Sequence, residues 1–157
     1  MEDSLARPRS VSPSSIRSIL QQDNGPATRA EVSGADAADP LPRPGEPYQA
    51  HARHSNRPEM MIHFVLRDLS YEGFAYADCE RIRLVPGEKP GSGPVLILRF
   101  NGSVVTEVLI EGRHLHSLYH WIGLHRCPWI WEHPSPAQFT DDNATLISRI
   151  TFRQIER

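Results

Sequence analysis

The amino-acid sequence predicts an α+β fold: a small antiparallel sheet or half-barrel of about six strands with one helix, preceded by a disordered N-terminal tail. Three observations predict it. Short runs rich in β-branched and aromatic residues recur from Met60 onward. One segment among them has the 3.6-residue period of a helix. Residues 1–58 instead hold eight of the fourteen prolines, and they contain too few apolar residues to form a core.

The tail is expected to give way to a single domain, residues 59–157, near Pro58. Residues 1–58 contain seven arginines and seven acidic residues, so the domain has the whole net charge of −2. Residues 13–22 form the one structured segment expected in the tail. They follow an N-cap candidate, and Ile16, Ile19 and Leu20 lie on one face of the resulting short helix. Either this helix recruits a partner, or the three residues match the spacing by chance.

Apolar runs mark the first strands of the domain. Residues 61–66 form one strand, and residues 74–85 form one bent strand or two short ones. Residues 87–94 contain three glycines and two prolines, which predicts a connecting loop. Their spacing differs from that of a phosphate-binding loop, in which a Lys-Ser or Lys-Thr pair opens a helix.

Residues 95–110 predict a hairpin around Asn101-Gly102. A two-residue loop would mix polar and apolar side chains on both faces. A three-residue loop over 100–102 pairs even-numbered with even-numbered residues, and it gathers the aliphatic side chains on one face. That face would consist of Leu96, Leu98, Val104, Val108 and Ile110.

A helix over residues 113–126 follows, ended by Pro128. Its apolar stripe consists of Leu115, Leu118, Tyr119 and Ile122. Two more strands, residues 129–132 and 146–153, complete the order β-β-β-β-α-β-β. The side chains expected to point together from the last strand are Leu146, Ile150 and Phe152.

In residues 60–126, Phe74-Ala75-Tyr76-Ala77-Asp78 leads into the strand Ile82-Arg83-Leu84, and a helix with Leu115, Leu118 and Ile122 follows the hairpin. This layout resembles that of bacterial pleckstrin-homology-like domains. The resemblance rests on this arrangement and includes no diagnostic motif. It ends where Trp129-Ile130-Trp131 and a further strand follow the helix. It implies scaffolding or membrane-associated binding without catalysis, and it transfers no site residue.

Composition and charge argue against several classes of function. A net charge of −2 without a run of basic residues does not suit a nucleic-acid partner. No stretch reaches the roughly 18 consecutive apolar residues of a transmembrane helix. No apolar segment follows the N-terminal residues as in a signal peptide, and only Cys79 and Cys127 are present. A cytoplasmic location is therefore expected.

The first functional hypothesis is a non-enzymatic interaction or adaptor domain of unknown partner. Trp129 and Trp131 form either a second core layer or, if exposed, the centre of an interface with Arg126 nearby. The expected partner-binding residues are thus Ile16, Ile19, Leu20, Arg126, Trp129 and Trp131. No catalytic residue and no cofactor is expected under this hypothesis.

The alternative hypothesis is a metal- or small-ligand-binding domain, with hydrolysis as a reaction that it could support. His116 and His120 are four residues apart, so their side chains project together from a helix. Cys127 or His133 would supply a third ligand to zinc. The segment lacks, however, the Asp-His pair of metallohydrolases and the glutamate of a metalloprotease helix.

Overall fold

The structure, a computed structural model, describes residues 39–156, which form seven strands and one α-helix in two sheets. This confirms the predicted α+β class. The expected helix at 13–22, with Ile16, Ile19 and Leu20, lies outside the described residues. No helix within residues 39–156 has the length and apolar character needed to cross a bilayer.

The three-stranded sheet has the order β2-β1-β6. Strands β1 (Met61–Val65) and β2 (Tyr71–Ala75) are antiparallel, whereas β6 (Trp129–Trp131) runs parallel to β1. The sheet is therefore mixed, because the chain passes through the helix before it returns beside β1. Ile62 and Phe64 alternate with outward residues along β1 and are fully buried.

The four-stranded sheet is antiparallel throughout, with the order β3-β4-β5-β7. Its strands are β3 (Cys79–Val85), β4 (Val95–Asn101), β5 (Val105–Arg113) and β7 (Leu146–Ile155). Residues 74–85 thus form parts of two strands in different sheets, which raises the count from six to seven. A 3₁₀ turn over Tyr76–Asp78 separates them, and the buried Tyr76 hydroxyl anchors it by donating to the Cys127 carbonyl at 2.7 Å.

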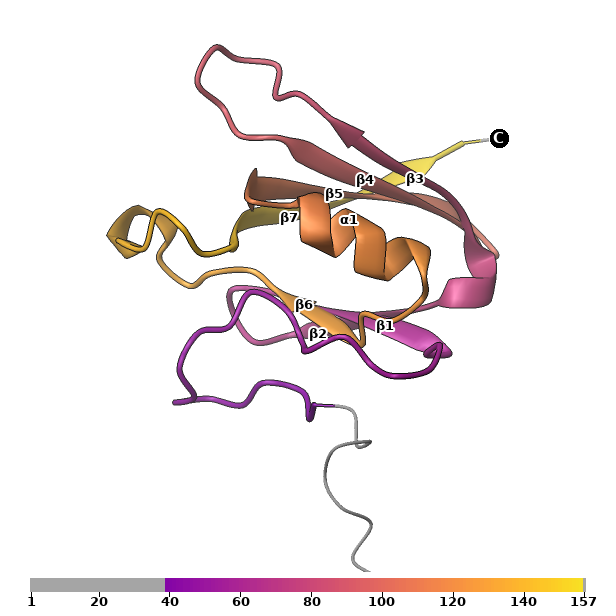
Figure 1. The fold of residues 1–157 in the computed structure, drawn as a ribbon. Coiled ribbons are helices and arrows are strands. Elements are labelled where there is room, and N and C mark those ends of the chain that lie inside the picture. Colours follow the sequence, from indigo (N-terminus) through magenta and orange to yellow (C-terminus); the bar gives the residue numbers. More distant parts are fainter. Residues whose placement is uncertain (1–38, 157) are drawn as a thin grey trace, which may run out of the picture. The chain divides into compact units, whose positions relative to one another are not determined.

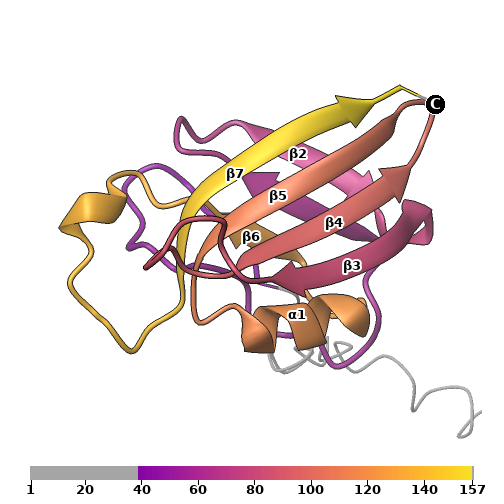
Figure 2. The same ribbon diagram turned by 90° about the horizontal axis from the view of Figure 1, so that it is seen from above.

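Helix α1 (His116–Gly123) lies between the two sheets and runs beside β3 (Figures 1 and 2). It is shorter than the expected 113–126 because β5 continues through Arg113. His114 and His125 have φ values of 56° and 57°, in the left-handed region, and these turns bound the helix on both sides. Leu115, Leu118 and Ile122 are buried as predicted, whereas Tyr119 is 43% exposed and does not belong to the apolar stripe.

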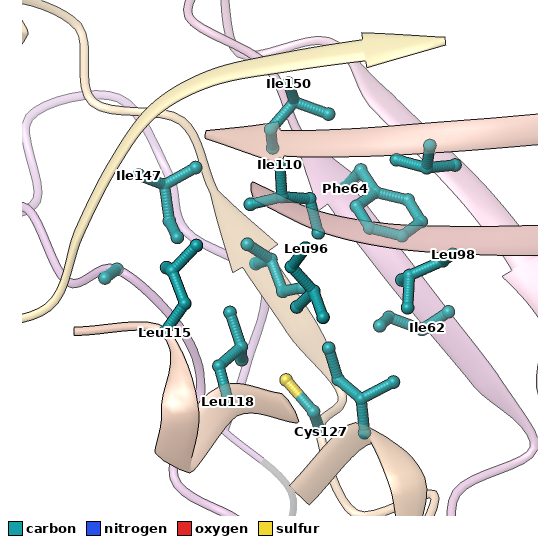
Figure 3. Close-up of a cluster of buried hydrophobic side chains, with 14 of the residues drawn as sticks. Ile62, Phe64, Leu96, Leu98, Ile110, Leu115, Leu118, Cys127, Ile147 and Ile150 are labelled. Atoms are coloured by element: carbon teal, nitrogen blue, oxygen red, sulfur yellow. The ribbon is translucent and has the colours of Figure 1, made fainter. Parts of the chain in front are cut away.

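The main core gathers side chains from both sheets and the helix (Figure 3). Aliphatic residues of β4, β5 and β7 meet those of β1 and α1, and Phe64 lies among them. The fully buried members with large side chains are Ile62, Phe64, Leu96, Leu98, Phe100, Ile110, Leu115, Leu118, Ile122, Ile130 and Ile147. The core therefore depends on contacts between segments far apart in the sequence.

In the β4–β5 hairpin, even-numbered residues pair with even-numbered residues as predicted, but the turn lies elsewhere. Leu96 pairs with Ile110 and Leu98 with Val108, even with even. The last pair is Asn101 with Val105, so the turn is 102–104, two residues later than expected. Phe100 explains the shift, because its buried ring stacks on Phe74 at 4.6 Å and keeps residue 100 within the strand. Val104 consequently lies in the turn and is 48% exposed, contrary to prediction.

A β-bulge changes the pairing of the last strand. The register between β5 and β7 shifts between Glu111 and Gly112, where Gly112 pairs with Ile147. Ile147 therefore points into the core, and Leu146 points to the opposite side of the sheet, next to Arg113. The prediction that Leu146 shares a face with Ile150 is thus wrong.

Residues 39–58 form one compact unit with the residues that follow, while the domain boundary expected near Pro58 stays a prediction. His51 forms an antiparallel bridge with Ile130 of β6. The Ala52 N–H donates to the Trp129 carbonyl at 3.0 Å, and the Trp131 N–H donates to the Ala50 carbonyl at 2.9 Å. This segment thus covers the free edge of β6 and part of the outer face of the three-stranded sheet.

Candidate ligand-binding face

The two tryptophans of β6 form a second core layer, which is one of the two predicted alternatives. Trp129 and Trp131 are each 4% exposed and pack against Ala52 and Val65. The Trp129 indole donates from Nε1 to the Asp39 carbonyl at 3.2 Å. Arg126 is half-buried in the turn after α1. The tryptophans therefore do not form an exposed interface.

The four candidate zinc ligands do not converge. Cys127 is buried in the core, where its thiol donates to the Trp129 carbonyl and burial raises the pKa of the thiol to about 12. His133 lies beyond the other end of β6, in edge contact with Tyr48 at 4.3 Å, and burial lowers its pKa. His116 and His120 are exposed on α1. No group of three or more His, Cys, Asp or Glu side chains within residues 39–156 has the arrangement to hold a metal ion.

A cavity of about 530 Å³ lies on the outer face of the four-stranded sheet. This is the face turned away from the helix, seen from the front in Figure 2. Its floor consists of side chains from all four strands, and the loop between β3 and β4 contributes a wall. The sequence prediction treats that loop only as a connection.

Arginines are concentrated on the same outer face. Even-numbered residues of β4 and β5 point into the core, so odd-numbered residues point outward. We define the arginine face as the outward arginines of the four strands: Arg81, Arg83, Arg99, Arg113, Arg149 and Arg153. With Lys89 of the β3–β4 loop they make up seven of the twelve basic residues in 39–156.

Five acidic residues share the surroundings of this face: Glu80, Glu88, Glu107, Glu111 and Asp142. The face therefore has an excess of positive charge, although the protein as a whole is acidic. Glu107 lies opposite Arg153 in the strand register, and Glu111 lies opposite Arg149, although neither pair comes within salt-bridge distance. The two glutamates offset part of the positive charge on the β5–β7 side of the face.

On the β3–β4 side of the face, two arginines lie opposite each other. Arg81 lies directly opposite Arg99, a like-charged cross-strand pair that costs stability. Glu80 offsets part of this charge, with 3.3 Å between its Oε2 and Arg99 Nε. Within the described residues, neither Arg81 nor Arg83 forms an ion pair. An anion bound between β3 and β4 would therefore relieve repulsion that the domain itself leaves in place.

Arg113 is held at the mouth of the cavity by two neighbours. Its guanidinium donates to the Asp142 carboxylate at 2.8 Å and lies 5.6 Å from the centre of the Phe139 ring. Its buried Nε has no hydrogen-bond partner among the residues that the structure describes. Asp142 and Phe139 thus fix the position of this arginine, and Asp142 already neutralises part of its charge.

Sequence reasoning missed this face because its members come from four strands. The local signal in the sequence is the alternation of arginine with aliphatic residues in β3 and β7. A scan against protein-family models, a search of curated proteins and a search of solved structures find no match. The resemblance to pleckstrin-homology-like domains stays a prediction.

Proposed function

We propose that this protein is a non-enzymatic interaction module that binds an acidic, partly aliphatic protein segment on the outer face of the four-stranded sheet. The observation that carries the proposal is the gathering of six arginines on one sheet face of an acidic domain. Guanidinium groups form paired hydrogen bonds to carboxylates, so the face complements glutamate and aspartate side chains.

The chemistry of the face favours binding over catalysis. A guanidinium stays protonated at every physiological pH, so arginines orient anions without exchanging protons with them. The two thiols of the chain also suit a passive role, because burial raises the pKa values of both Cys79 and Cys127. Unpaired cysteines agree with the cytoplasmic location that the sequence predicts.

An acidic protein segment suits the face better than a nucleic acid does. The outward positions of its strands within residues 79–155 contain no aromatic side chain on which bases could stack. Glu107 and Glu111 lie in the middle of the face and would repel a continuous phosphate backbone. Ile97 and Leu109 separate the charged rows and offer contacts to aliphatic side chains.

Fluorescence anisotropy with labelled probes tests the proposal. The probes are a short peptide of glutamate and leucine, the same peptide with glutamine in place of glutamate, and a single-stranded oligothymidine. We expect the acidic peptide to bind full-length protein, and added salt to weaken the complex. The double variant Arg81→Gln, Arg83→Gln should weaken peptide binding about tenfold, since each exposed charge pair contributes about 0.2–1 kcal/mol.

The matched control is the double variant Arg43→Gln, Arg57→Gln, which removes the same charge from exposed arginines outside the sheet. It should bind the acidic peptide as the unmodified protein does. Equal losses in the two double variants would indicate attraction by net charge alone and contradict the proposal. Tighter binding of oligothymidine than of the acidic peptide would replace the proposed partner with a nucleic acid.

A further inference from the structure

We infer that the cavity at the loop end of the arginine face binds a small organic anion with an aliphatic body, such as a medium-chain carboxylate. The ligand differs from the protein segment proposed above, although the site lies on the same face. The inference rests on three properties of the cavity: an aliphatic floor, a preformed wall and an excess of cations at its rim.

The floor is unusual for an outward sheet face. The exposed side of an antiparallel sheet is ordinarily polar, with apolar residues kept on the core side. Here the floor is aliphatic, and Leu146 is only 6% exposed although the bulge turns it away from the core. The aliphatic lining residues are Val85, Val95, Ile97, Leu109 and Leu146. The volume of about 530 Å³ lies within the roughly 300–1,000 Å³ common for small-molecule sites.

The wall is built by a structured loop. The Ser92 hydroxyl donates to the Lys89 carbonyl at 2.6 Å, and the Ser92 N–H donates to the same oxygen at 3.0 Å. Gly93 passes so close to the Gly112 carbonyl that any side chain at position 93 would collide with it. The loop is therefore closed on itself and held against β5, so the cavity exists before a ligand arrives.

Cations outnumber anions around the cavity. The charged lining residues are Lys89, Arg113, Arg149 and Arg153, with Glu88 and Glu111 opposing them. Arg149 and Arg153 are exposed and form no ion pair with a described residue at salt-bridge distance. Arg113 is already paired with Asp142, so the lining cations without a salt bridge to a described residue are Lys89, Arg149 and Arg153. A monoanionic head at this rim would gain charge-assisted hydrogen bonds while its aliphatic chain covers the floor.

Calorimetric titration of the full-length protein tests this inference with four ligands. Decanoate and decyl phosphate combine an anionic head with an aliphatic chain, acetate lacks the chain, and decyltrimethylammonium reverses the charge. We expect one decanoate or decyl phosphate to bind per chain below the micellar concentration, with no detectable heat from acetate or decyltrimethylammonium. The ratio of the decanoate affinity to the decyl phosphate affinity shows whether the rim prefers a carboxylate or a phosphate head.

Two substitutions locate the site. Leu109→Thr removes aliphatic contact from the floor and introduces a β-branched residue, a type that suits a strand. Arg149→Gln removes one cation from the rim. Each should weaken decanoate binding about fivefold. The matched controls are Val104→Thr, in the exposed hairpin turn, and Arg43→Gln. Both controls should leave the affinity unchanged.

The inference is overturned if decyltrimethylammonium binds as tightly as decanoate, or if the controls weaken binding as much as the site variants. The variant Arg81→Gln, Arg83→Gln separates it from the proposed function, because these arginines do not line the cavity. That variant should bind the acidic peptide about tenfold more weakly and retain its affinity for decanoate. Peptide binding without decanoate binding contradicts only the cavity inference, and decanoate binding without peptide binding contradicts only the proposed function.

Discussion

A single hydroxyl group, that of Tyr48, connects the two sheets. It donates to the Trp131 carbonyl of β6 at 3.1 Å and accepts from the Ile147 N–H of β7 at 3.0 Å. Tyr48→Phe keeps the ring but leaves two backbone groups without this partner, each of which costs about 1–3 kcal/mol when buried. We expect urea titration to show that the free energy of unfolding falls by about 2 kcal/mol. Tyr119→Phe, at an exposed position, should change it by less than about 0.5 kcal/mol.

The two cysteines should differ in reactivity because they differ in burial. Cys127 is enclosed by the core and has a pKa of about 12, whereas Cys79 is half-buried and its pKa is raised less far. Only the thiolate reacts with an alkylating reagent, so native protein at pH 8 should be modified slowly at Cys79 and not at Cys127. Mass spectrometry after iodoacetamide treatment measures both sites. Labelling of Cys127 before Cys79 would contradict the enclosed core, while guanidinium chloride should make both thiols reactive.

At the scale of single elements, two glycines give opposite predictions. A Cβ atom at Gly112 would collide with the Leu146 carbonyl across the β5–β7 bulge, whereas one at Gly123, the last residue of α1, would meet no atom within 4 Å. Gly112→Ala should therefore lower the free energy of unfolding by about 1–3 kcal/mol. Gly123→Ala should raise it by about 0.5–1 kcal/mol, because alanine favours the helix. An unchanged free energy of unfolding in Gly112→Ala would show that the bulge is not tightly packed.

The elements themselves were predictable where local alternation decides them. Alternation in residues 95–110 predicts which aliphatic residues share a face, and Leu96, Leu98, Val108 and Ile110 are all buried. The position of the turn was not predictable, because it depends on the contact of Phe100 with Phe74 of another sheet. The bulge that places Leu146 and Ile150 on opposite faces was not predictable either, because it arises from the pairing of β7 with β5.

At the scale of the whole molecule, the candidate site shows a similar limit. The sequence indicates that arginines alternate with aliphatic residues, and therefore that they point away from the core. It does not indicate that four strands place these arginines side by side, which follows only from the order β3-β4-β5-β7. Net charge is accordingly a poor guide here, because a chain of −2 presents one basic face.

Residues 39–58 should contribute to the stability of the domain. Residues 39–58 cover Trp129 and Trp131, and they satisfy backbone groups of β6 and of the turn after α1. A chain that begins at residue 59 should therefore expose both indoles and remove the partners of the Trp131 N–H and carbonyl, which are Ala50 and Tyr48. We expect its tryptophan emission to shift to the red and its Tm to fall, relative to a chain that begins at residue 39. Identical emission and Tm in the two chains would mean that the segment only lies on the surface, and that the boundary near Pro58 predicted from composition describes the stable unit after all.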